Sequence, residues 1–350
     1  MKQVTGGVCA AQGFSAAGIH CGIRRNQSKR DLALIYSAVP ASAAAVYTSN
    51  LVKGAPLTVT KAHLADGKAQ AIVCNSGNAN TCNANGIEVR DLTMTEEGGT
   101  SLEHLKDDAE LAALIVQSPN VFGVVEHLAE QAEWIHARKG LLITGFTEAM
   151  AYGLLATPGS QGADIVCGEG QSFGLSQAFG GPYLGLMATR KAFVRNLPGR
   201  LVGQTVDNKG KRAFVLTLST REQHIRREKA VSNICSNAGL CAMTCAMYLA
   251  SMGGTGLRHM AQLNRDKAEY LKAGLAKLGF RPVYSGQTFN EFVMAAPAGF
   301  DAKWKRLLEE KKIMFGMDLS KWYPLADSYL FCVTETRSRA DIDAILKEIA

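Results

Sequence analysis

The feature that most constrains the fold is an alternation of short apolar runs and helical patterns that begins near residue 111. The run Leu111–Val116 is continuously apolar, as a strand buried on both faces would be. The apolar side chains between Val124 and Ile135 then recur at the spacing of one helix face. Further apolar runs follow at Leu141–Ile143, Ala163–Val166 and Leu184–Ala188. Strands and helices at these spacings predict βαβ units around a mostly parallel sheet.

The last third of the chain has a different pattern, which predicts an α+β domain. A long apolar helix is expected at Ile234–Met252, and an amphipathic helix at Leu257–Leu278. Strand, helix, strand and helix are then expected, in this order, at Glu291–Ala296, Ala302–Lys311, Tyr329–Val333 and Arg339–Ile349. Ser338 is predicted to cap the last helix, with Asp341 three residues further on.

The pattern of apolar runs and turn residues in residues 1–88 differs from that in the rest of the chain. They carry β-like runs separated by turn residues, at Leu32–Tyr36, Ala43–Thr48, Leu57–Thr60 and Ala71–Asn75. This segment also holds a net charge of +5, out of +7 for the whole chain. We therefore predict that residues 1–88 form a β-rich N-terminal segment, distinct from residues 89–350.

The composition excludes several classes of protein. Hydrophobic residues make up 47% of the 350 residues and charged residues 20%, as in ordinary globular proteins. The nine cysteines form no C-x-x-C pair, and no apolar signal segment follows the N-terminal lysine, so reduced thiols and a cytoplasmic location are expected. No unbroken run of 18 apolar residues is present, so no membrane span is predicted. The basic residues are too scattered to predict nucleic-acid binding.

Two short motifs could suggest cofactor or metal chemistry, but their spacing favours simpler interpretations. The glycines of Gly168–Gly174 are spaced differently from the G-x-G-x-x-G of dinucleotide sites. A glycine-rich loop at the C-terminal edge of a sheet is the alternative, and this edge is where α/β proteins bind ligands. Cys241 and Cys245 lie four positions apart among apolar residues, with no histidine nearby, so a buried helix face is favoured over a metal site. We predict no metal.

The densest polar cluster of the sequence is Thr220–Lys229, which reads TREQHIRREK. On a helix, several of its cationic or titratable side chains would form a charged surface; the candidates are Arg221, His224, Arg226 and Arg227. A solvated helix face and a surface for an anion or a partner protein both remain open at this point.

Ten ordered strings between residues 89 and 350 resemble one family. They are VQSPNVFG at 116–123, GADIV at 162–166, GEGQS at 168–172, FGGPYLG at 179–185, PGRLVG at 198–203, FVLTL at 214–218, the cluster at 220–229, SNIC at 232–235, FNEF at 289–292 and CVTETR at 332–337. This part of the chain resembles the α (first) subunit of the two-subunit glycine dehydrogenase (decarboxylating), the P-protein of the glycine cleavage system.

Residues 1–88 resemble a different enzyme. The strings GFSAAGIH at 13–20, DLALIY at 31–36 and VCNSGNAN at 73–80 are similar to glutamate N-acetyltransferase (ornithine acetyltransferase) of arginine biosynthesis. That family cleaves itself before a nucleophilic threonine that lies beyond this segment, so the resemblance implies no nucleophile here. The chain thus looks like two partial enzymes joined near residues 86–91.

The first resemblance implies an α/β fold and a place in an assembly. Residues 89–235 would form the second half of a fold-type I pyridoxal-phosphate transferase-like large domain, truncated at its start, and residues 236–350 a C-terminal α+β small domain. The implied function is glycine decarboxylation in the glycine cleavage system. The implied partners are a β subunit that carries pyridoxal phosphate on its lysine, and the lipoyl H-protein, which receives the aminomethyl group.

The resemblance also implies that this chain holds no cofactor covalently. Ser172 stands where the imine-forming lysine would be, and the next lysine is Lys191. Thr144 and Gly145 stand where an aspartate would pair with the pyridine nitrogen. Ser232 and Asn233 are expected to contact the cofactor across an interface. An acetyltransferase-derived chain without its nucleophile, and a non-functional chimera of the two enzymes, remain the alternatives.

Overall fold

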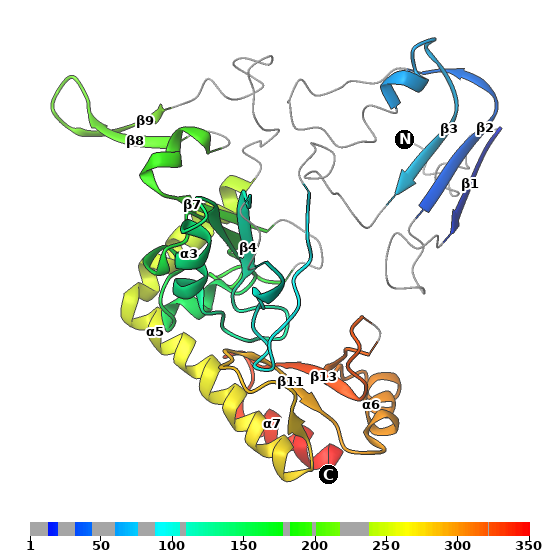
Figure 1. Cartoon of the computed structure of the whole chain (residues 1–350), viewed down its shortest axis with the longest axis vertical. Helices are drawn as coiled ribbons and strands as arrows, with labels where there is room; N and C mark the ends of the chain where they lie inside the picture. Colours follow the sequence, from blue (N-terminus) through cyan, green and yellow to red (C-terminus); the bar gives the residue numbers. More distant parts are fainter. Residues whose placement is uncertain are drawn as a thin grey trace. The chain divides into compact units, whose positions relative to one another are not determined.

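The computed structural model describes residues 13–19, 32–43, 60–75, 88–105, 110–177, 183–197, 201–217, 238–320 and 322–350 (Figure 1). The chain divides into two compact units. The first unit comprises Met1–Asp91 and Pro198–Ile234, and the second comprises Leu92–Leu197 and Cys235–Ala350. The boundaries predicted at 88/89 and 235/236 stay a prediction.

The first unit contains two separate antiparallel structures. Strands β1 (Phe14–Ile19), β2 (Leu32–Ser42) and β3 (Lys68–Asn75) form a sheet in the order β1-β2-β3. Strands β8 (Leu201–Val206) and β9 (Arg212–Thr217) form a hairpin. Two of the predicted runs, 43–48 and 57–60, lie almost wholly outside the described residues, whereas 32–36 and 71–75 lie within β2 and β3.

The main sheet of the second unit confirms the predicted parallel arrangement. Its four strands are β4 (Ala113–Gln117), β5 (Leu141–Phe146), β6 (Ile165–Glu169) and β7 (Gly185–Thr189), in spatial order β4-β5-β6-β7. The first three strands are parallel, and β7 runs antiparallel to β6. The carboxyl ends of three strands therefore meet at one edge of this sheet.

One face of this sheet is covered by helix α3 (Leu128–His136). Leu128, Ala132 and Ile135 of the helix pack in one buried cluster with Leu114 and Leu142 of the sheet. Each of these leucine and isoleucine side chains contributes roughly 1.5–3 kcal/mol through its burial, and Ala132 contributes less. The helix begins later than predicted, because Val124 forms a β-bridge with Thr288 and is therefore not available to start the helix.

The described residues of the second unit also contain four short 3₁₀ segments. They are η2 (Glu103–Leu105), η3 (Ala149–Gly153), η4 (Pro158–Gln161) and η5 (Lys191–Asn196). Of these, η3 follows β5 directly and packs against the following long helix, so it lies at the sheet edge where the site is built.

Helix α5 (Gly239–Lys277) covers both helical stretches that the sequence predicts. Gly253 interrupts it with φ 59° and ψ −179°, a backbone conformation that is essentially restricted to glycine. The break falls between the predicted segments 234–252 and 257–278, so the two-helix prediction is confirmed for the described residues of those segments.

The first half of α5 is apolar on its exposed side. Leu240, Met243 and Met247 are each more than half exposed. By length and composition alone, α5 could cross a membrane, since an 18-residue window has a mean hydropathy of 1.3 and only 6% of it is buried. We predicted no membrane span because the sequence has no unbroken run of 18 apolar residues, and α5 has none either. A helix that contacts another protein through an apolar face can have the same composition as a membrane-spanning helix.

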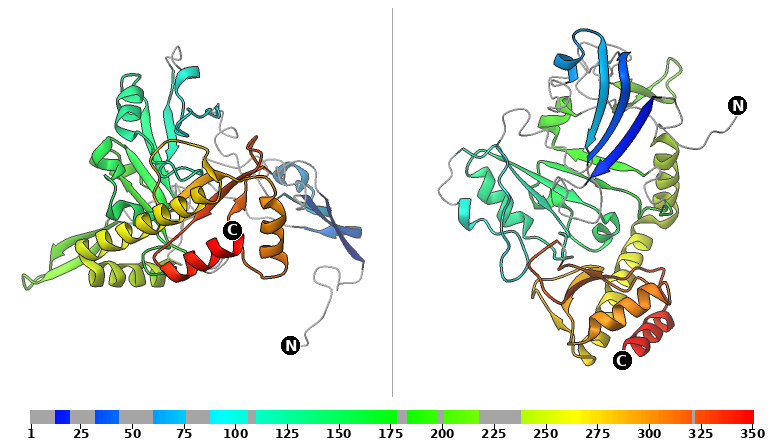
Figure 2. Two further views of the ribbon diagram at one scale, coloured as in Figure 1. Left: turned by 90° about the horizontal axis from the view of Figure 1, so that it is seen from below. Right: turned by 90° about the vertical axis from the view of Figure 1, so that its right-hand side faces the viewer.

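The C-terminal domain matches the predicted α+β pattern. Strands β10 (Arg281–Pro282), β11 (Glu291–Ala295), β12 (Met317–Asp318) and β13 (Ser328–Cys332) form an antiparallel sheet in the order β10-β11-β13-β12. Helices α6 (Phe300–Glu309) and α7 (Arg339–Ile349) complete the domain, and Figure 2 shows α7 beside the C-terminal end of α5.

The last helix confirms the predicted cap in detail. The hydroxyl of Ser338 accepts a hydrogen bond from the Asp341 amide at 3.1 Å, and the Ser338 amide donates to Asp341 Oδ2 at 2.8 Å. This reciprocal arrangement satisfies two amides that a bare helix end would leave unpaired. The bounds Arg339–Ile349 agree with those predicted from the sequence.

Candidate functional site

The loops after β4, β5 and β6 converge on η3 at the carboxyl edge of the main sheet. The backbone amide of Met150 donates to Glu148 Oε1 at 2.9 Å and to the Ser172 hydroxyl at 3.3 Å. The Tyr152 hydroxyl donates to the Ser118 carbonyl at 2.7 Å. Three chain segments that come after three different strands are thus joined through one short helix.

Residues of the C-terminal sheet face these loops. Asn290, which is buried, donates through Nδ2 to Glu148 Oε2 at 3.4 Å and lies 3.9 Å from Cys332 Sγ. Asn290 immediately precedes Glu291, the first residue of β11, and Cys332 ends β13, directly opposite Glu291 in the sheet. We refer to Glu148, Ser172, Asn290, Glu291 and Cys332 as the sheet-edge cluster.

The sheet-edge cluster is acidic and only partly buried: Asn290 is buried, Glu148, Ser172 and Glu291 are half-buried, and Cys332 is exposed. Burial, followed by the nearby charge of Glu148, raises the pKa of the Glu291 carboxyl above its usual value. Desolvation of the thiol by the surrounding protein, followed by the charges of Glu291 and Glu148, also raises the pKa of Cys332, although the residue as a whole is exposed. A carboxyl with a raised pKa can donate a hydrogen bond or a proton closer to neutral pH than an ordinary one. Such groups gather at functional sites, which makes this cluster the candidate site.

These side chains offer hydrogen bonding and proton exchange, and the raised pKa of the Cys332 thiol disfavours its nucleophilic thiolate form. They include no amine that could bond to an aldehyde, and two carboxylates disfavour a phosphate group nearby. Across the described residues, no group of three His, Cys, Asp or Glu side chains could hold a metal ion.

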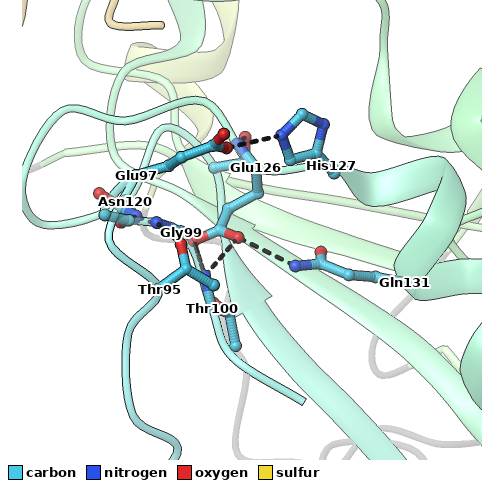
Figure 3. A network of polar contacts seen from close by, with 10 residues as sticks. Thr95, Glu97, Gly99, Thr100, Asn120, Glu126, His127 and Gln131 are labelled. Carbon is cyan, nitrogen blue, oxygen red and sulfur yellow. Dashed lines mark hydrogen bonds and ion pairs between the residues drawn. The ribbon is translucent and has the colours of Figure 1, made fainter. Parts of the chain in front are cut away.

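A second polar network surrounds Glu126, which is buried (Figure 3). Its carboxylate accepts hydrogen bonds from the amide and hydroxyl of Thr100, at 2.9 Å each, from Asn120 Nδ2 at 2.9 Å and from Gln131 Nε2 at 2.9 Å. The Glu126 amide donates to Ser118 Oγ at 3.2 Å. The network fixes the loop that leads into α3 and connects it to the end of β4.

An open cavity of about 550 Å³ adjoins this network. Its lining consists of Thr95, Glu96, Glu97, Gly99, Thr100, Leu102, Glu126, His127, Glu130, Gln131 and Trp134. The donors named above satisfy the Glu126 carboxylate. At the cavity, Glu97 Oε2 lies 3.7 Å from His127 Nε2. These contacts account for Glu126 and Glu97 as parts of the structure and do not by themselves identify a ligand for the cavity.

A third network lies at the start of β6. Asp164, which is buried, contacts His136 Nε2 at 2.7 Å, the Leu142 amide at 2.9 Å and Arg190 Nη1 at 3.1 Å. Burial alone would raise the pKa of Asp164, but the hydrogen bonds from His136 and Leu142 and the charge of Arg190 outweigh it and hold the pKa below its usual value. This carboxylate joins α3, β5 and the residue after β7.

The structure brings only part of the predicted site together. Ser172 lies in the turn after β6 and belongs to the sheet-edge cluster. Thr144 lies within β5, where its hydroxyl is fully buried and has no hydrogen-bond partner. Lys191 is exposed at the start of η5. Cys245 is buried on α5, as predicted for a core face, while Cys241 is partly buried.

The remaining predicted positions lie outside the described residues. These are Arg221, His224, Arg226 and Arg227 of the basic cluster, and Ser232 and Asn233. Glu148 is not identified from the sequence. Asn290 and Cys332 occur there only within family strings, and Glu291 also begins a predicted strand. The usable signal was the pair of polar residues Asn290-Glu291 directly before the apolar strand residues Phe292–Met294.

Comparison with known proteins places these features in a family. The family model described as Glycine cleavage system P-protein matches residues 59–349, and so begins 30 residues before the predicted start at 89. A probable glycine dehydrogenase (decarboxylating) subunit 1 of Desulfotalea psychrophila is 53% identical over 267 residues, which cover 76% of this chain and 59% of the relative. Its counterpart in Solibacter usitatus is 48% identical over 256 residues, covering 72% and 56%.

Solved structures agree with this assignment. A crystal structure of glycine decarboxylase (P-protein) of the glycine cleavage system, in inhibitor-bound form, is 39% identical with a TM-score of 0.69, covering 77% of this chain and 60% of that one. An alanine–glyoxylate aminotransferase from Nostoc sp., 17% identical with a TM-score of 0.54, covers 77% and 70%, and shares the fold alone. The predicted fold class, a truncated fold-type I pyridoxal-phosphate transferase-like domain with a C-terminal α+β domain, is confirmed. The chain spans less than two thirds of the length of these curated relatives.

Proposed function

Since this chain belongs to the glycine cleavage system P-protein family, we propose that it acts as a subunit-1-type component of glycine dehydrogenase (decarboxylating). In this role it would support glycine decarboxylation as the partner of a catalytic β subunit. The observation that carries the proposal is the extent of its identity to subunit 1 proteins, 53% over 267 residues in one relative. Substrate, activity and partners are proposed because the chain spans only part of those relatives.

The sheet edge supports a role without a cofactor lysine. Pyridoxal phosphate supplies an electron sink for decarboxylation of an amino acid when it is bound. The described residues do not fit covalent attachment of this group, because Ser172 occupies the expected position and its hydroxyl already accepts from the Met150 amide. Thr144 offers a neutral hydroxyl where an acid would be needed, and Glu148 and Glu291 disfavour a phosphate beside them. We therefore assign the cofactor to the β subunit.

The cofactor test uses this chain alone and with a β subunit. The purified chain is incubated with pyridoxal phosphate, reduced with borohydride and mapped by peptide mass spectrometry. We expect only weak, scattered labelling of exposed lysines such as Lys191 and Lys209, and glycine decarboxylation only after a β subunit is added. One stoichiometrically labelled lysine, together with decarboxylation by the chain alone, would overturn the proposal.

The partner proposal rests on the charge pattern of the sequence. Arg221, His224, Arg226 and Arg227 are proposed to contact the β subunit, and Ser232 and Asn233 to reach the cofactor across that interface. The lipoyl H-protein is the proposed acceptor, glycine the substrate and the cytoplasm the location. Replacing Arg221 and Arg226 by glutamate should weaken association with the β subunit, most strongly at low salt. Unchanged association at low salt would contradict this interface.

For residues 1–88 we keep the acetyltransferase resemblance as a proposal about sequence origin, without acetyltransferase chemistry. Its support is the three strings at 13–20, 31–36 and 73–80. The glycine cleavage family match begins at residue 59 and includes the last of these strings, so only the first two lie outside it. An acetyl-transfer assay tests whether any activity accompanies the segment, and none is expected. Co-purification with a β subunit separates a working subunit from a non-functional chimera.

A further inference from the structure

The lining of the cavity beside the Glu126 network is strongly acidic. It includes four glutamates and neither lysine nor arginine. Glu97 lies 3.7 Å from His127, so a protonated His127 balances at most one of these charges. In the described part of the chain, Glu96 and Glu130 form no ion pair. Four carboxylates around one hollow create a negative potential, and this potential attracts a cation.

Glu126 is a buried acid that has no cationic partner among the described residues. The hydrogen bonds to its carboxylate come from Thr100, Asn120 and Gln131, which are all neutral. These donors satisfy the oxygen atoms but leave the negative charge unbalanced. A buried charge is costly unless a charge of opposite sign lies near it. A cation bound in the adjoining cavity would supply that charge.

Gln131 adds a buried acceptor that calls for a hydrogen-bond donor. The residue is 4% exposed and lines the cavity, and its Oε1 has no partner in the described part of the chain. The orientation of the amide is set by Nε2, which donates to Glu126 Oε2 at 2.9 Å, because a reversed amide would place an oxygen against the carboxylate. In Figure 3 the unpaired oxygen lies on the side of the amide that faces His127. A ligand with N–H groups would remove the cost of leaving this acceptor unpaired.

The remaining lining indicates the class of cation. Leu102 and Trp134 are half-buried and give the cavity an apolar wall, and its volume of about 550 Å³ suits a small molecule. A metal ion needs several ligand atoms that converge on one point, and no such group of side chains is found among the described residues. An organic cation with an aliphatic chain fits these features better.

We propose that this cavity binds a short aliphatic diamine. One ammonium group donates to Gln131 Oε1 and balances the charge of Glu126, while the aliphatic chain lies against Leu102 and Trp134. The second ammonium group lies among the exposed glutamates of the rim, of which Glu130 is one. The proposal does not depend on the role in glycine decarboxylation, so its test needs neither a β subunit nor glycine.

The probe is putrescine, a four-carbon diamine, titrated into the purified full chain at low salt and followed by calorimetry. We expect saturable one-to-one binding with a Kd of about 1 mM or tighter. The affinity should fall as sodium chloride is added, because salt screens the attraction between the charges. The neutral diol of the same chain length should not bind. Magnesium chloride should displace putrescine no better than sodium chloride of equal ionic strength.

Matched variants locate the site. Glu130→Gln removes one charge of the rim and should weaken putrescine binding roughly threefold, as expected for an exposed ion pair. Glu133→Gln removes an exposed charge from the same helix outside the lining, and should leave the affinity unchanged. Gln131→Met replaces the amide by an apolar side chain of similar size and should weaken binding about tenfold or more. Because this last change also removes a donor to Glu126, urea unfolding shows whether the variant is folded, and the two glutamate variants decide if it is not.

Four results would overturn the proposal. The first is the absence of saturable putrescine binding up to about 10 mM. The second is equal binding of the neutral diol, which would make the cavity an apolar site without charge recognition. The third is displacement by magnesium beyond the effect of ionic strength, which would assign the glutamates to a metal ion. The fourth is equal weakening by Glu130→Gln and Glu133→Gln, which would leave only a diffuse attraction to the acidic surface.

Discussion

Asn290 donates its side-chain amide to Glu148 Oε2 and so connects the start of the C-terminal sheet to the loop after β5. The two residues are 142 positions apart in the chain. Because Glu148 also accepts from the Met150 amide, a movement of either domain would disturb the packing of η3. The sheet-edge cluster is therefore the candidate site and also connects the main-sheet domain to the C-terminal domain.

Glu291→Gln should make stability less dependent on pH. The folded protein raises the pKa of Glu291, so the folded state binds a proton more tightly than the unfolded chain. Stability is thus lost as the pH rises from about 4.3, the ordinary glutamate value, through the folded value. The variant should match the parent near pH 4 and exceed it at pH 8 by on the order of 1 kcal/mol in urea unfolding. Glu309→Gln, on the exposed surface of α6, is the control and should show no such trend.

Asp164→Asn should have the opposite pH dependence. The folded state lowers the pKa of Asp164, so its stabilising contribution is present above the ordinary aspartate pKa and is lost as the pH falls through the folded value. At pH 7 the variant should lose roughly 1–3 kcal/mol of unfolding free energy, because it weakens the contacts to His136 and Arg190. The loss should shrink below pH 4. Asp327→Asn, at an exposed residue with φ 53° that asparagine tolerates, should be neutral. An equal loss at pH 3 and pH 7 would contradict this explanation.

Glu126→Ala should loosen the loop before α3. The change leaves donors of Thr100, Asn120 and Gln131 without their acceptor, and should cost roughly 2–4 kcal/mol. Hydrogen exchange of the Thr100 amide is the local measurement, and it should accelerate more than that of amides within β5. Glu130→Ala, at an exposed position on α3, is the control and should leave the exchange of the Thr100 amide unchanged.

Gly253→Ala and Gly254→Ala should differ in effect although the two residues are neighbours. A Cβ atom at either position would meet no atom within 4 Å, so packing does not distinguish them. Gly253 has φ 59°, which strains any other residue by about 1–3 kcal/mol, whereas alanine at Gly254 should be neutral or slightly stabilising. Thermal unfolding of both variants tests this, and equal melting temperatures would show that the helix does not retain the break in solution.

The fold could be predicted from the sequence where local patterns decide it. The bounds of α7 and its cap follow from Ser338 and Asp341, because capping depends on residues three positions apart. The helical pattern was extended too far at Val124, since its pairing with Thr288 involves a segment more than 160 residues away. The antiparallel direction of β7 could not be obtained from its apolar run, because a buried strand has the same composition in either direction.

The candidate site could be predicted only in part for the same reason. Ser172 was identified through a family string, and the structure places it beside Glu148 through the shared Met150 amide. No local sequence pattern indicates that Glu148 and Glu291 lie close together. The pKa of Glu291 is raised by burial, which arises only when the two domains are assembled.

The long helix α5 belongs to two hydrophobic cores at once. Leu257 and Ala261 pack with Met150 and Phe289, while Leu271 and Leu275 pack with the C-terminal sheet and its helices. Because α5 contributes apolar contacts to both cores, unfolding of this helix would destabilise both. The two cores are therefore expected to unfold together. Calorimetry of the full chain should then record a single thermal transition for the second unit. The unit that unfolds cooperatively would be the whole second unit, and neither of its domains would unfold separately.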